Sequence, residues 1–191
     1  TSATLSSAGR FDLFKQRLGI GECVERTWES PFNYWEQGCF YLPQMPPPAN
    51  NTAVHTHNVI EKVWPLINAA GGRTFVLCTS LAAVRAAADE LQARLEANGN
   101  PYPLFVQGDG PKMRLIEEFR AHGNAVLVGS MSFWEGVDVK GEALSLVVID
   151  KIPFAPPNDP VMMARSRAVE ASGRRPFDEI TLPEAVITLK Q

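Results

Sequence analysis

Four short apolar runs constrain the fold of this chain more than any other feature. They occupy residues 74–79, 103–107, 125–128 and 145–150. Within each run the apolar residues follow one another instead of alternating with polar ones, which is typical of strands buried on both faces of a parallel sheet. The runs therefore predict four strands of an α/β domain.

Helical patterns lie between and around these runs. In residues 81–99 apolar side chains recur every three or four positions and end at Asn98 and Gly99, and residues 111–122 repeat this pattern before Gly123. A helix over 57–70 is expected before the first strand, with Pro65 either kinking it or marking its true start. Further predictions are a strand over 38–42, a helix that Asp159 caps and a last helix over 182–191. Alternating strands and helices predict a mainly parallel sheet flanked by helices.

Composition excludes several classes of protein. The 191 residues are 45% hydrophobic, which is enough for one packed core. Lys and Arg number 18 against 21 Asp and Glu, a net charge of −3, which argues against a globally basic nucleic-acid wrapper and a polybasic membrane binder and leaves a local basic stripe open. No apolar run approaches the roughly 20 residues of a membrane span, and no signal peptide is evident. A cytoplasmic protein without a membrane partner is expected.

Cysteines, tryptophans and histidines yield further expectations. Cys23, Cys39 and Cys78 form no CxxC pair, so no metal site is predicted and the thiols are expected to be reduced and mostly buried. Three tryptophans are expected to pack in the core: Trp28, Trp35 and Trp64. Three histidines are expected to be solvated at helix ends: His55, His57 and His122.

Small and hydrogen-bonding residues follow three of the predicted strands. Ligands of open parallel sheets bind at the carboxyl ends of the strands. There the sequence has Thr79 and Ser80, then Gln107 with Gly108, then the loop 129–138. Thr79 and Ser80 also suit a helix cap, and the loop also suits a structural role with Phe133 and Trp134 as core plugs. Both interpretations stay open from the residues alone.

Four segments resemble the DinG and YoaA branch of the XPD-like DNA helicases. They are TSATL at 1–5, FVLCTS at 75–80, VQGD at 106–109 and VLVGSMSFWEGVDVKGEALSLVVIDKIPFAPPNDP at 126–160. The resemblance implies a RecA-like three-layer α/β fold and an ATP-dependent 5′ to 3′ DNA helicase of superfamily 2 that acts in DNA repair. Residues 1–20 then hold motif III and a linker from helicase domain 1, and residues 21–191 form helicase domain 2, ending inside motif VI.

The resemblance also assigns roles to residues. Ser130 is expected to contact a phosphate of single-stranded DNA, together with Thr79, Ser80, Gln107, Gly108 and Ser132. Trp134 is expected either to stack on a base or to anchor its loop. Gly136 and Asp138 are expected to approach ATP, and Glu135 to lie in the same cleft. Gln191 opens motif VI as a catalytic residue, and coupling to domain 1 is assigned to Ser2, Ala3 and Thr4.

Essential parts of such a motor are expected outside this chain. ATP with Mg²⁺ is bound mainly by domain 1, and a 4Fe–4S cluster, where the parent protein has one, also belongs to that domain. Without the Walker A loop and the motif VI arginines, this chain alone is expected neither to hydrolyse ATP nor to unwind DNA. The alternative is a non-catalytic RecA-like module that binds single-stranded nucleic acid or a partner protein. An RNA helicase is a weaker reading, because KIPFAPPNDP at 151–160 resembles the XPD-like branch.

Overall fold

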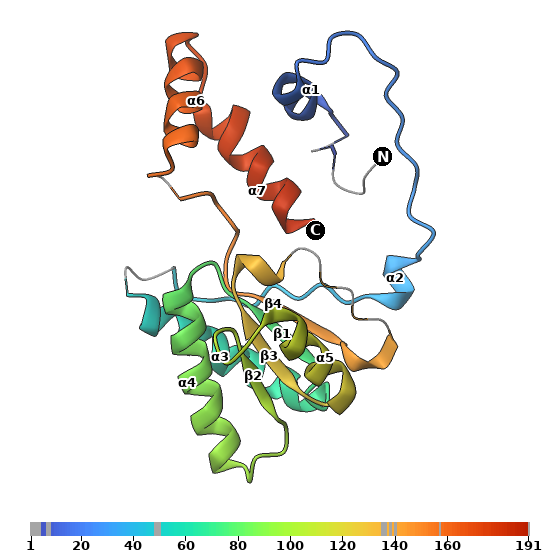
Figure 1. The fold of residues 1–191 in the computed structure, drawn as a ribbon, viewed down its shortest axis with the longest axis vertical. Helices are drawn as coiled ribbons and strands as arrows, with labels where there is room; N and C mark the ends of the chain where they lie inside the picture. The colour runs from blue at the N-terminus through green and yellow to red at the C-terminus, as the bar shows by residue number, and fades with distance from the viewer. Residues whose placement is uncertain are drawn as a thin grey trace. The chain divides into compact units, whose positions relative to one another are not determined.

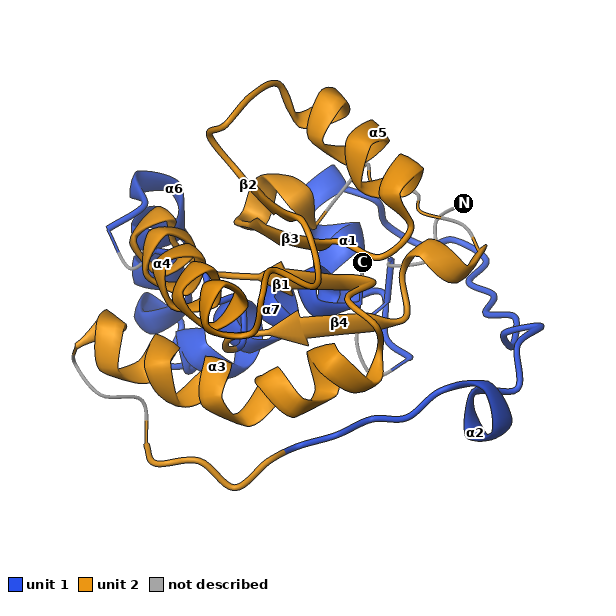
Figure 2. Ribbon diagram, turned by 90° about the horizontal axis from the view of Figure 1, so that it is seen from below, with its two compact units in different colours: residues 1–42, 152–191 blue, residues 43–151 orange. Residues whose placement is uncertain are grey.

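The structure is a computed structural model that describes residues 5–6, 9–47, 51–134, 137, 139, 141–156 and 158–190 (Figure 1). It divides into two compact units, which Figure 2 distinguishes by colour. One comprises residues 43–151, and the other comprises residues 1–42 and 152–191. The domain boundary expected near residue 20 stays a prediction.

A four-stranded parallel sheet forms the centre of unit 43–151. Its strands are β1 (Thr74–Leu77), β2 (Leu104–Val106), β3 (Val126–Gly129) and β4 (Leu146–Ile149). Their order is β2-β3-β1-β4, and every neighbouring pair runs parallel. All four predicted strands are therefore confirmed, as is the parallel α/β fold class.

Helices cover both faces of this sheet (Figure 2). On one face, α3 (Thr52–Ala69) and α4 (Leu81–Ala97) bury side chains such as Ile60 and Leu91 against Val76 and Val128. On the other face, α5 (Lys112–His122) packs against β1 and β3 in a second cluster. The three layers arise because β1 and β3 carry apolar side chains on both faces and must bury both.

The edge strand β4 departs from the predicted burial. Val148 is buried on the face that α3 covers, whereas Val147 and Ile149 are 49% and 38% exposed. The helix on their face, α5, packs over β1 and β3 instead. A consecutive apolar run thus identified β4 as a strand but overstated its burial.

The N-terminal part of α3 also differs from its prediction. The helix begins at Thr52, five residues earlier than expected, because the Asn51 side chain accepts the Ala53 N–H at 2.9 Å. Pro65 lies inside the helix and does not mark its start. His55 is buried rather than solvated, because its ring lies under the end of β4, where Nε2–H donates to the Asp150 carbonyl oxygen.

The other unit is mainly helical. It contains α1 (Asp12–Leu18), α2 (Tyr34–Gln37), α6 (Pro160–Ala171), a π-helical turn (Phe177–Thr181) and α7 (Leu182–Leu189). The predicted cap is confirmed, since the Asp159 carboxylate accepts the Met162 N–H at 2.8 Å. Glu184 of α7 pairs with Arg17 of α1 and, at 3.5 Å, with Arg165 of α6. One sheltered carboxylate therefore connects three helices.

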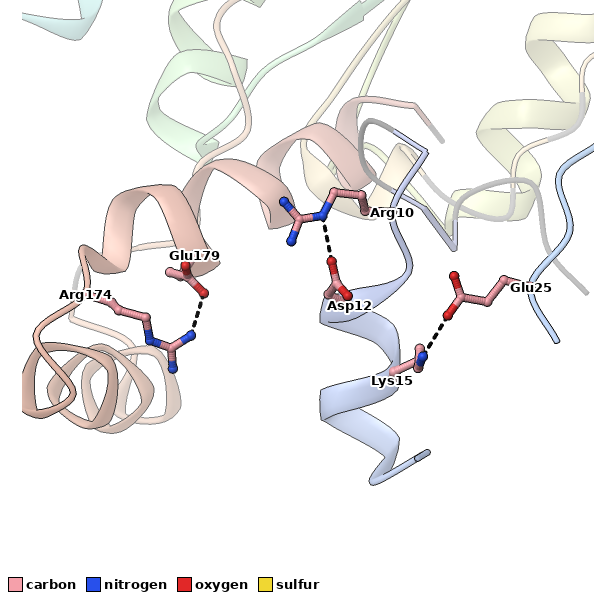
Figure 3. Close-up of polar contacts among 6 residues, drawn as sticks. All are labelled: Arg10, Asp12, Lys15, Glu25, Arg174 and Glu179. Atoms are coloured by element: carbon pink, nitrogen blue, oxygen red, sulfur yellow. Dashed lines mark hydrogen bonds and ion pairs between the residues drawn. The ribbon is translucent and has the colours of Figure 1, made fainter. Parts of the chain in front are cut away.

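Further ion pairs on this unit lie at its surface (Figure 3). Arg10 pairs with Asp12 at 2.7 Å, Lys15 Nζ with Glu25 at 2.7 Å, and Arg174 with Glu179 at 3.0 Å. Solvent screens such pairs, so they add little to stability. Across the described part of the chain, no helix has the length and apolar character needed to cross a lipid bilayer.

Three predictions about residues 23–42 are wrong. Residues 38–42 form no strand, and none of the described strands pairs with them. Trp28 and Trp35 are 74% and 98% exposed, and Cys23 and Cys39 are exposed as well. The segment contributes no residue to either buried cluster, whereas Trp64 packs against the first cluster as predicted.

Gly72 yields a stability test of this fold. Its φ is +79°, and a Cβ there would lie 2.2 Å from the Asn124 carbonyl oxygen, which is backbone and cannot move aside. Gly99 has a similar φ of +77° with open space around it, so it controls for conformational strain alone. We expect G99A to lower the free energy of unfolding by about 1 kcal/mol. G72A should cost about 1–3 kcal/mol more because of the clash.

Chemical denaturation of both variants measures the difference. Equal losses would contradict the close approach of Gly72 to Asn124.

Candidate functional site

The carboxyl ends of the four strands lie along one edge of the sheet, because all four strands are parallel. Following the strand order, the residues beyond these ends are Gln107, Ser130, Thr79 and Asp150. The sequence predicted the first three as a site from separate segments. The structure brings them side by side and adds Asp150.

A row of hydrogen bonds links these strand ends. The Ser130 N–H donates to Gln107 Oε1 at 2.6 Å, and the Cys78 N–H donates to the Gly129 carbonyl at 2.8 Å. The Thr79 N–H then donates to Asp150 Oδ1 at 3.0 Å. Each turn that follows a strand is therefore held by the neighbouring one.

The Gln107 side-chain amide takes part in this row of hydrogen bonds through its oxygen alone. Because Oε1 accepts the Ser130 N–H, the Nε2 end is the half left to donate, and no partner for it lies among the described residues. Gly108 follows with φ +115° and open space around its Cα, which lets a ligand approach the backbone. Gln107 is half-buried, so its amide is held by the protein and still reaches the surface.

Ser80 combines the two roles that the sequence left open. It is the N-cap of α4, where its Oγ accepts the Ala83 N–H at 3.2 Å. A hydroxyl that accepts this bond keeps its own proton for another acceptor. Thr79 differs, since its N–H is bound to Asp150 and its Oγ1 lies 3.5 Å from the same carboxylate. The capping interpretation is thus confirmed for Ser80, and no acceptor for its hydroxyl proton lies among the described residues.

The loop after β3 packs tightly where the structure describes it. Ser130 is 9% exposed, and Met131–Phe133 form a short 3-10 helix, with Phe133 buried in the second cluster. A Cβ on Gly129 would lie 2.7 Å from the Phe133 ring, so glycine is required there. Ser132 lies in this short helix and is exposed.

Trp134 lies in the second buried cluster and is 8% exposed. Its indole nitrogen is buried without a hydrogen-bond partner among the described residues. This position supports the loop-anchoring role of the two that the sequence allowed. Base stacking would require the ring to leave the cluster.

Two basic residues that the sequence analysis missed lie at the start of α5. Lys112 Nζ donates to the Ser132 carbonyl at 2.5 Å and lies 5.6 Å from the Phe133 ring centroid. Arg114 donates to the Asp109 carbonyl at 2.8 Å. Cations are disfavoured in the first turn of a helix, where the dipole is positive. A basic pair just after Pro111 was therefore the sequence signal that could have drawn attention to this end of the helix.

Two buried groups, Cys78 after β1 and Asp150 after β4, have shifted pKa values. Burial raises the pKa of the Asp150 carboxyl, and Lys151 at 3.7 Å, the Thr79 N–H and His55 oppose this rise. Burial, together with the nearby Asp150 charge, raises the pKa of the Cys78 thiol to about 12. Cys78 is therefore protonated and unreactive near neutral pH, which leaves it a packing role.

Several predicted site residues lie outside the described residues. They are Ser2, Ala3, Thr4, Glu135, Gly136, Asp138 and Gln191. Val137 and Val139 are described, and both pack against the second cluster. In the described part of the chain, no group of three His, Cys, Asp or Glu side chains is arranged to hold a metal ion.

Known proteins are similar in sequence to this chain along its whole length. The chain is 44% identical to the ATP-dependent DNA helicase YoaA of Haemophilus influenzae and 42% identical to YoaA of Escherichia coli, in each case over 100% of this chain and 29% of the relative. It is 37% identical to the ATP-dependent helicase DinG of Mycobacterium tuberculosis, over 100% of this chain and 28% of that protein. The chain thus spans less than a third of the length of these relatives.

A family match covers most of the chain. Residues 63–191 match the helicase C-terminal domain, a stretch that includes all four strands and every described residue of the hydrogen-bonded row. The DinG and YoaA resemblance is thereby confirmed, and this chain belongs to the helicase C-terminal domain family.

Proposed function

We propose that this chain is the second motor domain of an ATP-dependent 5′ to 3′ DNA helicase that acts in DNA repair in the cytoplasm. In this proposal the carboxyl edge of the sheet binds the backbone of single-stranded DNA. The observation that carries it is the bond between Gln107 and Ser130, which commits one end of the amide and leaves the other to donate at the sheet edge that also carries the Ser80 hydroxyl. Phosphate oxygens are the acceptors that such donors suit.

In this proposal both neutral hydrogen-bond donors and two cationic side chains bind the polyanion. The chain has a net charge of −3, so its overall field does not attract DNA. Gln107, Ser80 and Ser130 supply hydrogen bonds without charge. Lys112 and Arg114 add positive charge at the start of α5, although Glu118 at 3.7 Å partly offsets that of Arg114. The phosphates are thus held by local groups at one edge of the domain.

The names of the relatives support the ATP-dependent part of the proposal. YoaA is named an ATP-dependent DNA helicase, and the shared segment covers loop 129–138. We assign Gly136, Asp138 and Glu135 to the nucleotide side of that loop, Gln191 to motif VI, and Ser2, Ala3 and Thr4 to coupling with domain 1. ATP with Mg²⁺ would bind mainly to domain 1. Closing and reopening of the cleft between the domains would then move the edge that binds DNA.

The first prediction of the proposed function concerns the side-chain amide of Gln107. In Q107E a carboxylate oxygen can still accept the Ser130 N–H, but the donor is lost and a negative charge faces the phosphates. We expect single-stranded DNA affinity to fall about tenfold, with the free energy of unfolding within about 0.5 kcal/mol of wild type. Fluorescence anisotropy and denaturation of the full-length protein measure the two quantities.

Q92E is the matched control, because it adds the same charge at Gln92 on the exposed face of α4. Equal DNA affinity in wild type and Q107E would argue against a phosphate contact at this amide.

The second prediction concerns salt dependence. For the isolated chain we expect weak binding of single-stranded DNA with a shallow slope of log affinity against log salt. K112A and R114A should each reduce the magnitude of that slope by about 0.7. R120A, at the last turn of the same helix, removes an equal charge and should leave the slope unchanged. Equal slopes in all four proteins would exclude phosphate contacts by Lys112 and Arg114.

The third prediction separates a motor from a binding module. D138A in the full-length protein should abolish most DNA-stimulated ATP hydrolysis while single-stranded DNA binding is retained, because we assign Asp138 to ATP. A steady-state ATPase assay with and without DNA measures this loss. Full stimulated turnover in D138A would contradict the nucleotide role that we assign to Asp138, and no DNA-stimulated turnover in the wild-type protein would favour the module without nucleotide chemistry.

A further inference from the structure

We propose that Asp150 is a positioning residue for DNA binding: its carboxylate holds the turn between β1 and α4 so that the Ser80 hydroxyl faces a backbone phosphate. This inference rests on the proposed function and extends it to a residue on the edge strand. Asp150 itself, being anionic, makes no contact with the DNA.

The first observation is that nearly every polar group of Asp150 binds a neighbouring strand or helix. Its side chain is only 4% exposed, yet the carboxylate accepts the Thr79 N–H at 3.0 Å and lies 3.7 Å from Lys151 Nζ. Its own N–H donates to the Leu77 carbonyl at 3.1 Å, and its carbonyl accepts a bond from His55 Nε2 at 3.0 Å. Asp150 is therefore held rigidly by β1 and α3.

The second observation is where the β1 ladder ends. The Cys78 N–H still donates to β3 at Gly129, so the next N–H, that of Thr79, is the first beyond the ladder. Asp150 supplies the acceptor for it. Without that acceptor the peptide at Thr79 has nothing in the sheet to fix its orientation.

The third observation is the short distance along the chain from this bond to the DNA-binding hydroxyl. Ser80 directly follows Thr79 and begins α4, with its Oγ accepting the Ala83 N–H. The cap sets the distance of Oγ from the helix, and the Asp150 bond sets the direction from which the chain enters it. Together they determine where the Ser80 Oγ lies, and so which acceptors its proton can reach.

The effect of charge distinguishes positioning from electrostatics. A buried carboxylate near phosphates opposes DNA binding, so an electrostatic role would make its removal favourable. The D150N variant keeps a side-chain oxygen for the Thr79 N–H and loses the charge, whereas the D150A variant loses both. A positioning role predicts that D150N resembles wild type and that D150A resembles S80A.

The experiment is a double-mutant cycle in the full-length protein. Single-stranded DNA affinity and DNA-stimulated ATP hydrolysis are measured for wild type, D150N, D150A, S80A and the double variant D150A/S80A. We expect D150A and S80A each to weaken DNA affinity about fivefold, and the double variant to be no weaker than S80A alone. The KM for DNA should rise equally while kcat at saturating DNA changes less than about twofold.

The matched control is D89A, which removes an exposed carboxylate from α4 two turns beyond Ser80. It should leave DNA affinity unchanged. Thermal unfolding of each variant separates a general loss of stability from the change in the KM for DNA.

Three outcomes would overturn the inference. They are additive losses in D150A/S80A, wild-type DNA affinity in D150A, and a loss in D150N as large as that in S80A. The comparison of D150N with S80A can still be made if D150A does not fold. If Q107E still weakens binding in those cases, the proposed function stands without a role for Asp150. If Q107E and S80A both bind as wild type, the proposed function itself fails.

Discussion

Parallel pairing of β1 with both β3 and β4 is the constraint on which the rest of the structure depends. A parallel sheet with apolar side chains on both faces has to be covered twice, which places α3 and α4 on one side and α5 on the other. It also directs every strand end to the same edge. Polar residues separated by up to 71 positions, such as Thr79 and Asp150, thereby become neighbours.

The proposed DNA-binding role requires an acidic chain to bind a polyanion, and the polar edge offers a way to do so. Backbone turns are held by side-chain acceptors, Gln107 Oε1 for Ser130 and Asp150 Oδ1 for Thr79. These bonds leave N–H and O–H donors at the edge, and Lys112 and Arg114 add charge at its α5 end. In the proposed function the phosphates would contact groups whose orientation the sheet has already set, so little ordering entropy would be lost on binding.

Particular residues show where sequence reasoning succeeded and where it did not. The strands, the Asp159 cap and the Ser80 cap follow from local chemistry, and the structure has all of them. Residues 38–42 had the composition of a strand but found no partner, since pairing is not a local property. His55 looked solvated because nothing near it in sequence reveals that β4 ends above its ring. Trp35, nearly fully exposed, illustrates that an aromatic residue packs only where a surface meets it.

The amino-acid sequence by itself determined the class of fold, the strands, their connecting helices and the family. These depend on apolar periodicity, capping side chains and motifs that are contiguous along the chain. Only the tertiary structure decided which strands are neighbours, that Gln107 binds Ser130, and that Asp150 holds Thr79. The reason is physical: a hydrogen bond between strand ends depends on their order in the sheet, and that order is selected by the packing of all three layers together.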